Sequence, residues 1–307
     1  MTVCIAAICE PGIIFGAADR MITTGDVEFE PSTQKIFSIT NSIVVMTAGN
    51  SVFHAEIFRA VNNIVSARIT QEPSNWWTVK DVAELYASHR NIAKGNKAEN
   101  SILTPLGLSR DTFIARQSAM KDEFIAFLTN RILNYNVPDI EAIVTGIDMD
   151  GGAHIFVVNN DNVSCWDNIG FASIGSGSRH AKSQFMFTGH SRNALLPESL
   201  LLTYTAKKRS EVSPGVGEET DMFMMGPHLG SYVILNQETM RKLNESYKKM
   251  ILGEESAQNT AKNEVKRYVD RLAKRATKQS PVQKTTKIDG ELNEAPLSDG
   301  TTVSGAS

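Results

Sequence analysis

The stretch TVCIAAICEPGIIFGAAD, residues 2–19, decides the fold because it holds two apolar strands separated by a turn sequence. Pro presets φ for a turn and Gly accepts a positive φ, so we expect a type II turn with Pro11 and Gly12 at its centre. If the hairpin folds about Pro11, residues whose numbers sum to about 22 face each other. Asp19 is then expected beside Val3, at the start of the first strand.

A second hairpin is predicted from the segments KIFSIT (35–40) and IVVMTAG (43–49), which flank a two-residue turn. Folding at that turn places Lys35 opposite Thr47, and Gly49 lies a short step beyond. Lys35 and Gly49 are therefore expected at the same end of this hairpin.

The rest of the chain alternates between groups of helices and groups of strands. Asn50 or Ser51 can cap the first predicted helix, and Thr78 with Asp81 gives the second helix a box-like cap. Grouped elements of this kind favour an α+β protein with mainly antiparallel sheets between helix layers. In chain order we expect helices at 51–69 and 78–95, a loop at 96–111, an amphipathic helix at about 112–134, strands at 141–148, 153–160 and 164–168, helices at about 178–190 and 197–210, and strands at 221–225 and 231–235.

Composition excludes several classes of function. The 307 residues are 41% hydrophobic and carry a formal net charge of -3, which gives no electrostatic reason to expect binding to nucleic acid. No apolar run approaches the roughly 18 residues of a membrane span, and the first residues lack the order of a secretory signal. We therefore expect a cytoplasmic protein without nucleic-acid or membrane partners. The three cysteines and six histidines show no ligand spacing, so we expect neither a metal nor a cofactor.

The composition changes near residue 250. Residues 1–250 read as one domain, and residues 251–278 as a basic amphipathic helix with Val265 and Leu272 on its apolar stripe. We expect this helix to pack on its own body or on a neighbouring subunit. The tail at 279–307 is rich in Ser, Thr, Pro and Gly and is predicted to be disordered.

Thr2 is the strongest candidate for chemistry. We expect an aminopeptidase to remove Met1, which leaves a hydroxyl and a free α-amine on the same residue. An α-amine with an unperturbed pKa of about 7.7–8.0 can accept the hydroxyl proton near neutral pH. Such a residue is a nucleophile that carries its own base.

Five segments occur in this order along the chain: Thr2 itself, AADR with Asp19, KIF with Lys35, MTAG with Gly49, and SIGSGSRHA around Ser176. Together they resemble a proteasome β subunit. The resemblance runs from Thr2 to about Leu235 and also takes in AKKR (206–209) and the strand TDMFMM. It implies a four-layer αββα sandwich of the N-terminal nucleophile (Ntn) hydrolase type and a threonine endopeptidase in a homo-oligomeric ring. It also implies a polypeptide substrate, and it makes an ATP-dependent unfoldase or regulator a candidate partner.

The same resemblance implies a role for each of these residues. Lys35, kept protonated by Asp19, would place a positive charge near the nucleophilic oxygen of Thr2. The Gly49 N–H would donate to the oxyanion, and Ser176 would orient the α-amine.

Two further positions are implied to bind substrate. Thr23 would pair its backbone with an extended substrate, as an added strand does. Thr47 falls where the family lines its specificity pocket. A small polar residue there indicates no firm preference.

The sequence departs from the family pattern in two places. The strand GIIFGAAD is one residue longer than its usual counterpart, so we expect a bulge or a shifted turn to bring Asp19 to the site. The stretch 210–217 has extra residues and no Asp. Glu211 and Ser213 are its best substitutes for the family's additional Asp and Ser.

Other interpretations remain open. On the same fold the chain would serve as a small-amide hydrolase, or as a catalytically inactive structural subunit. Residue by residue, Asp19 with Arg20 would be a strand-end ion pair, and Ser176 a helix cap or part of a flexible loop. The joint occurrence with Thr2 favours catalysis.

Overall fold

The computed structural model describes residues 2–24, 27–30, 34–160 and 162–279. The chain divides into two compact units, Met1–Met250 and Ile251–Ser307. The first unit contains two antiparallel five-stranded sheets, a two-stranded sheet and several helices, so the protein is of mixed α and β structure.

The first sheet contains the predicted N-terminal hairpin at its centre. Cys4 pairs with Ala18 and Cys9 pairs with Ile13, which confirms the predicted register. The pairing is continuous between these ends, so the expected bulge is not needed. The Gly12 N–H donates to the Cys9 carbonyl at 2.8 Å, so the hydrogen-bonded turn begins one residue before the predicted one. The strand order is β10 (Phe171–Ile174), β1 (Cys4–Cys9), β2 (Ile13–Asp19), β11 (Thr220–Met225) and β12 (Tyr232–Ile234).

The second sheet is built on the second predicted hairpin. Ile36 pairs with Met46, and the Thr47 N–H donates to the Lys35 carbonyl at 3.2 Å, which confirms that Lys35 lies opposite Thr47. The strand order is β5 (Ile36–Ser38), β6 (Ile43–Gly49), β7 (Ile140–Ile147), β8 (Ala153–Asn159) and β9 (Asn162–Cys165).

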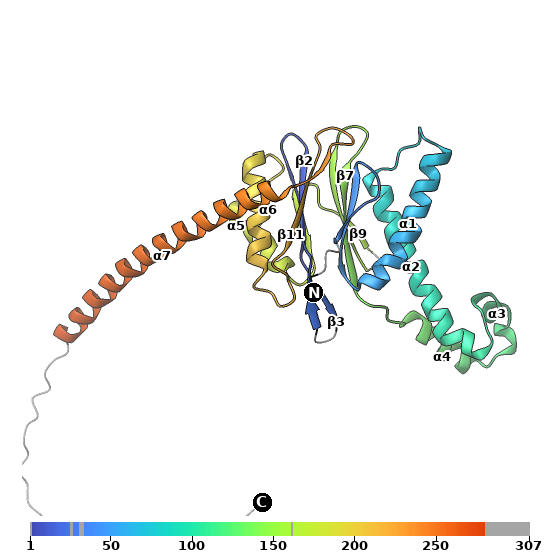
Figure 1. The fold of residues 1–307 in the computed structure, drawn as a ribbon. Helices are drawn as coiled ribbons and strands as arrows, with labels where there is room; N and C mark the ends of the chain where they lie inside the picture. Colours follow the sequence, from blue (N-terminus) through green and yellow to red (C-terminus); the bar gives the residue numbers. More distant parts are fainter. Residues whose placement is uncertain (1, 25–26, 31–33, 161, 280–307) are drawn as a thin grey trace, which may run out of the picture. The chain divides into compact units, whose positions relative to one another are not determined.

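The two sheets bury one face against each other, and helices cover their other faces (Figure 1). Successive strand residues point to opposite faces, so Ala6 of β1 joins Met46 of β6 in the core between the sheets. Ile5 instead packs with helices α5 (Ser178–Thr188) and α6 (Leu196–Ser210). Val45 packs with helices α1 (Ser51–Gln71) and α2 (Val79–Ala98). The strands are therefore apolar on both faces.

Helix caps follow the sequence closely. The Asn50 side chain accepts the Phe53 N–H at the start of α1, and Thr78 with Asp81 forms a complete capping box on α2. Each cap satisfies backbone N–H groups that have no partner within the helix.

The predicted loop at 96–111 and the predicted single helix at 112–134 are wrong. Ile102 and Leu103 are buried in a cluster with Phe113 and Leu128, so packing keeps this region helical in spite of its weak periodicity. Gly107 adopts a left-handed conformation with φ 68°, and this conformation ends the helical segment after Leu106. The observed elements are a π-helix at Glu99–Leu103, a 3-10 helix at Thr104–Leu106, α3 (Arg110–Ala115), a 3-10 helix at Gln117–Ala119, and α4 (Asp122–Leu133).

The remaining elements are a small sheet and a long helix. Strands β3 (Ile22–Thr24) and β4 (Val27–Phe29) pair with each other. Helix α7 spans Gln237–Gln279 and so begins well before the predicted boundary at residue 251. In the second unit the apolar side chains of Val265 and Leu272 are exposed. The predicted disordered tail lies outside the described residues except for Gln279. Among the helices that the structure describes, none has the length and apolar character needed to span a membrane.

Candidate active site

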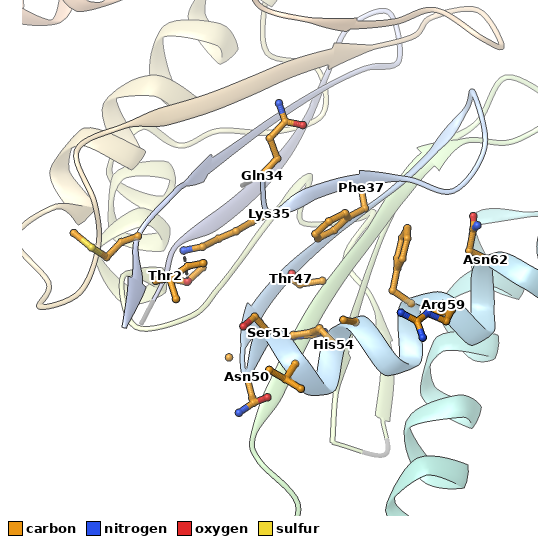
Figure 2. Close-up of a pocket in the computed structure, with 16 residues that line it drawn as sticks. Thr2, Gln34, Lys35, Phe37, Thr47, Asn50, Ser51, His54, Arg59 and Asn62 are labelled. Carbon is orange, nitrogen blue, oxygen red and sulfur yellow. Dashed lines mark hydrogen bonds between the residues drawn. The ribbon is translucent and has the colours of Figure 1, made fainter. Parts of the chain in front are cut away.

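The side chains of Thr2 and Lys35 meet at the ends of the two hairpins. Thr2 lies two residues before β1 and is 4% exposed, and Lys35 directly precedes β5. The Lys35 ammonium donates to Thr2 Oγ1 at 2.5 Å, and Figure 2 shows the two side chains pointing toward each other. An alcohol oxygen in contact with a cation is stabilised when it loses its proton. The two residues therefore form the core of a candidate nucleophilic site.

Asp19 holds Lys35 in place. Its carboxylate is fully buried and accepts the Lys35 ammonium at 3.0 Å on Oδ1 and 3.1 Å on Oδ2. It also accepts backbone N–H groups from Val3 at 2.9 Å, Met21 at 3.0 Å and Gly217 at 3.1 Å. A buried carboxylate requires such a full set of donors, and the set fixes the carboxylate in position.

Ser176 and its loop contact the backbone of Thr2. The Thr2 N–H donates to Ser176 Oγ at 3.2 Å, and removal of Met1 would turn this amide nitrogen into an α-amine. The Gly177 N–H donates to the Thr2 carbonyl at 3.2 Å. Gly175 has φ 86°, and an added Cβ would lie 2.3 Å from that carbonyl. Glu141 accepts the Gly175 N–H at 2.8 Å, so a carboxylate on β7 anchors this loop.

A cavity of about 730 Å³ opens beside Thr2. Thr47 of β6 and residues of α1 line it (Figure 2). Gly49 of β6 is also among its lining residues. Gly49 has φ 112°, and a Cβ there would lie 2.3 Å from the carbonyl oxygen of Asp139. Only glycine fits this position without displacing the backbone of the neighbouring segment.

The Gly49 N–H is directed to the cavity side of β6. Backbone N–H groups alternate between the two edges of a strand, and the Thr47 N–H donates to Lys35 on the β5 edge. The Asn50 N–H donates to Asp139 on the β7 edge at 3.4 Å. Gly49, between Asn50 and Ala48, therefore points its N–H to the same edge as Thr47, where the cavity lies. A donor there can stabilise an oxyanion that forms on a substrate bound at Thr2.

The stretch 210–217 reaches the site differently from the expectation. Glu211 Oε1 accepts the ammonium groups of Lys207 at 2.6 Å and Lys208 at 2.7 Å. The Ser213 N–H donates to the Ser210 carbonyl at 3.0 Å. Within this stretch, the residue that contacts the Asp19 carboxylate is Gly217, through its backbone N–H. Sequence reasoning missed this contact because a backbone donor leaves no signature in side-chain identity.

Lys207 is a second residue that sequence reasoning missed. Its ammonium donates to the carbonyls of Gly217 and Glu218 at 2.8 Å each, and its side chain is 0% exposed. Burial lowers the pKa of Lys207, opposed by its hydrogen bond to Glu211. The spacing of Lys207 and Glu211, one helical turn apart, is the sequence signal that predicts this pair.

The structure also decides one of the two remaining expectations. Arg20 binds Asp221, with Nε 3.0 Å from Oδ2, so the strand-end pair of Asp19 with Arg20 is wrong. Thr23 lies in β3, where its backbone pairs with Glu28, and its side chain is outside the described part of the structure. Its role in substrate pairing stays a prediction.

A comparison of the sequence with models of known protein families gave no match, and a comparison with curated proteins gave none either. Within the described residues, no group of three or more His, Cys, Asp or Glu side chains is placed to hold a metal ion. Any functional assignment therefore depends on the geometry around Thr2.

Proposed function

We propose that the protein is a threonine-type peptidase of the Ntn hydrolase class, with Thr2 as nucleophile once Met1 is removed. The observation that carries this proposal is the contact between the Lys35 ammonium and Thr2 Oγ1 at 2.5 Å, with Asp19 behind the ammonium. An alcohol at this position has a cation to stabilise its anion and, after Met1 removal, an amine to accept its proton.

In the proposed reaction the α-amine of Thr2 accepts a proton and returns it in each half-reaction. The α-amine of Thr2 takes the proton from Oγ1, directly or through a water, as the oxygen attacks the peptide carbonyl. The carbonyl oxygen becomes an oxyanion and receives the Gly49 N–H, a contribution worth about 2.7–4 kcal/mol in other enzymes. The amine then returns the proton to the leaving nitrogen. A water deacylates the resulting ester by the same path.

The packing of the fold supports the assignment to a four-layer αββα sandwich. One shared core lies between the two sheets, and a helix pair covers the outer face of each sheet. In this fold the chain start and the second hairpin meet at one end of the sheets, as Thr2 and Lys35 do. The proposal extends to a cytoplasmic homo-oligomeric ring that encloses the site, with an ATP-dependent unfoldase as a candidate partner.

The decisive experiment is intact mass spectrometry of the purified full chain with a β-lactone or epoxyketone probe. We expect loss of Met1 and one probe adduct on Thr2. The Thr2→Ala variant should lose the adduct, whereas Thr188→Ala, which changes an exposed threonine at the end of α5, should keep it. Retention of Met1 together with an unlabelled Thr2 would refute the proposal.

Substrate assays separate the alternatives. Casein and fluorogenic peptides test for a peptidase, and acylated amino acids test for a small-amide hydrolase. Hydrolysis that Thr2→Ala leaves unaltered would favour a structural subunit with a contaminating activity. Size-exclusion chromatography of the full chain tests the ring.

A further inference from the structure

His54 and Tyr86 form a buried hydrogen-bonded chain that ends at the backbone of Gly49. His54 lies in the first turn of α1 at the wall of the cavity (Figure 2) and is 4% exposed. Its Nε2 lies 3.0 Å from the Ala48 carbonyl oxygen, and its Nδ1 lies 2.5 Å from the Tyr86 hydroxyl. Tyr86 comes from α2 and is 1% exposed.

The direction of the two hydrogen bonds follows from which side-chain atoms carry a proton. Burial lowers the pKa of His54 to about 4, so near neutral pH the ring carries a single N–H. A carbonyl oxygen can only accept, so the proton is on Nε2 and points to Ala48. Nδ1 then accepts from Tyr86, whose pKa burial raises, so that the phenol keeps its proton. All donors therefore run in one direction, from Tyr86 through His54 to Ala48.

The acceptor at the end of this chain belongs to the same peptide unit as the Gly49 N–H. A trans peptide is planar, and its C=O and N–H point in opposite directions. A hydrogen bond that fixes the Ala48 oxygen therefore also fixes where the Gly49 hydrogen points. Hydrogen bonds in a chain polarise one another, by about 10–30% per bond, so a donor on the carbonyl strengthens the N–H as a donor.

We propose that His54 and Tyr86 are positioning residues for the oxyanion donor: they orient and polarise the Ala48–Gly49 peptide so that its N–H meets the oxyanion of the tetrahedral intermediate. The inference rests on the proposed function, because it assigns a task to groups behind the nucleophilic site. Neither side chain touches a reacting atom. The pair acts on the oxyanion through the backbone of β6.

The test compares variants of the full chain with Met1 removed, assayed with a fluorogenic peptide. His54→Leu removes the donor to Ala48 and should lower kcat roughly 10- to 100-fold, somewhat less than the 10²–10³-fold that loss of a whole oxyanion donor costs. KM should stay within about twofold, since the change acts on the transition state. His54→Gln keeps an N–H near the place of Nε2 and should recover most of kcat. Tyr86→Phe should fall between His54→Gln and His54→Leu.

A matched control is available on the other sheet. His190 is half-buried, and like His54 it has its Nε2 close to a strand carbonyl, 3.1 Å from that of Ile8. It is not among the residues that line the cavity. His190→Leu should cost stability without changing kcat per folded molecule. Affinity for a reversible peptide aldehyde, which forms an oxyanion on Thr2, should fall with His54→Leu in proportion to kcat/KM. An unchanged kcat in folded His54→Leu, or a loss of kcat without loss of aldehyde affinity, would overturn the inference.

A second measurement does not depend on activity or on a folded variant. Nitrogen-15 NMR of the imidazole in the wild-type chain should show a neutral His54 with its proton on Nε2. A proton on Nδ1 would refute the chain directly. If the wild type neither hydrolyses peptides nor takes the probe at Thr2, the proposed function fails, whereas an active wild type with normal His54→Leu kinetics isolates the failure to the present inference.

Discussion

The change Asp19→Asn tests the electrostatic centre of the site. The Asp19 carboxylate is fully buried and accepts the Lys35 ammonium and three backbone N–H groups. An asparagine side chain keeps one acceptor oxygen but turns an NH₂ group toward donors that need an acceptor. It also leaves the Lys35 ammonium, whose side chain is 12% exposed, without its counter-charge.

Removing one partner of a buried ion pair costs about 3–5 kcal/mol, because the remaining charge is left enclosed and uncompensated. In a domain of this size each kcal/mol shifts Tm by about 2–4 °C, so we expect Tm to fall by about 6–20 °C. Labelling of Thr2 by a β-lactone should also fall, because Lys35 is no longer held against Oγ1. Urea denaturation and differential scanning calorimetry measure the first effect, and mass spectrometry the second.

Asp221→Asn is the matched control for this prediction. Asp221 lies on β11, where its strand neighbour Thr220 pairs with Asp19, and its own partner Arg20 has a side chain that is 31% exposed. Water can solvate Arg20 when the pair is broken, so we expect a loss below about 2 kcal/mol and normal labelling of Thr2. A loss of less than about 1 kcal/mol in Asp19→Asn would show that the buried pair does not hold the site together.

Three further predictions concern the surroundings of the site. Gly175→Ala places a Cβ 2.3 Å from the Thr2 carbonyl at a φ of 86°, so we expect a loss of at least about 1–3 kcal/mol in urea denaturation and weaker probe labelling, and normal labelling would argue against a fixed loop. Lys207→Met removes the ammonium that holds the Gly217 carbonyl, so amide hydrogen exchange at Gly217 should quicken, and unchanged exchange would contradict this role. Burial lowers the pKa of His54 to about 4, below its unfolded value of about 6.5. The stability contributed by the neutral ring is therefore complete above about pH 6.5, and roughly 3 kcal/mol of it is lost as the pH falls toward 4. His54→Gln should lose less stability than the wild type between pH 7 and 4.5, and equal losses would refute the assignment.

Local sequence patterns predicted the parts of the site that lie within one hairpin or one helix end. The register of β1 with β2 followed from the position of Pro11 in the turn, and the register of β5 with β6 followed in the same way. The capping box at Thr78 was readable because its two residues are three positions apart. Turns and caps depend only on residues that are close in sequence, so they can be predicted without knowledge of the fold.

Contacts between distant segments could not be read in this way. The Gly217 N–H donates to the Asp19 carboxylate, and no local pattern signals this contact because the two residues are 198 positions apart in the sequence. The helical region at 99–106 was expected as a loop, because burial of Ile102 and Leu103 depends on partners elsewhere in the chain. Contacts of this kind depend on which helices and strands pack against each other in the folded chain.

By itself the sequence determined the two hairpins, and with them that Asp19 lies beside Val3 and Lys35 opposite Thr47. Only the tertiary structure decided that these hairpins bring the Lys35 ammonium onto Thr2 Oγ1, since that contact joins two different sheets. The physical reason is the distance along the sequence over which each kind of interaction acts. Turns and caps are fixed by backbone preferences over a few residues, whereas the meeting of two sheets is fixed by apolar faces that must be buried together.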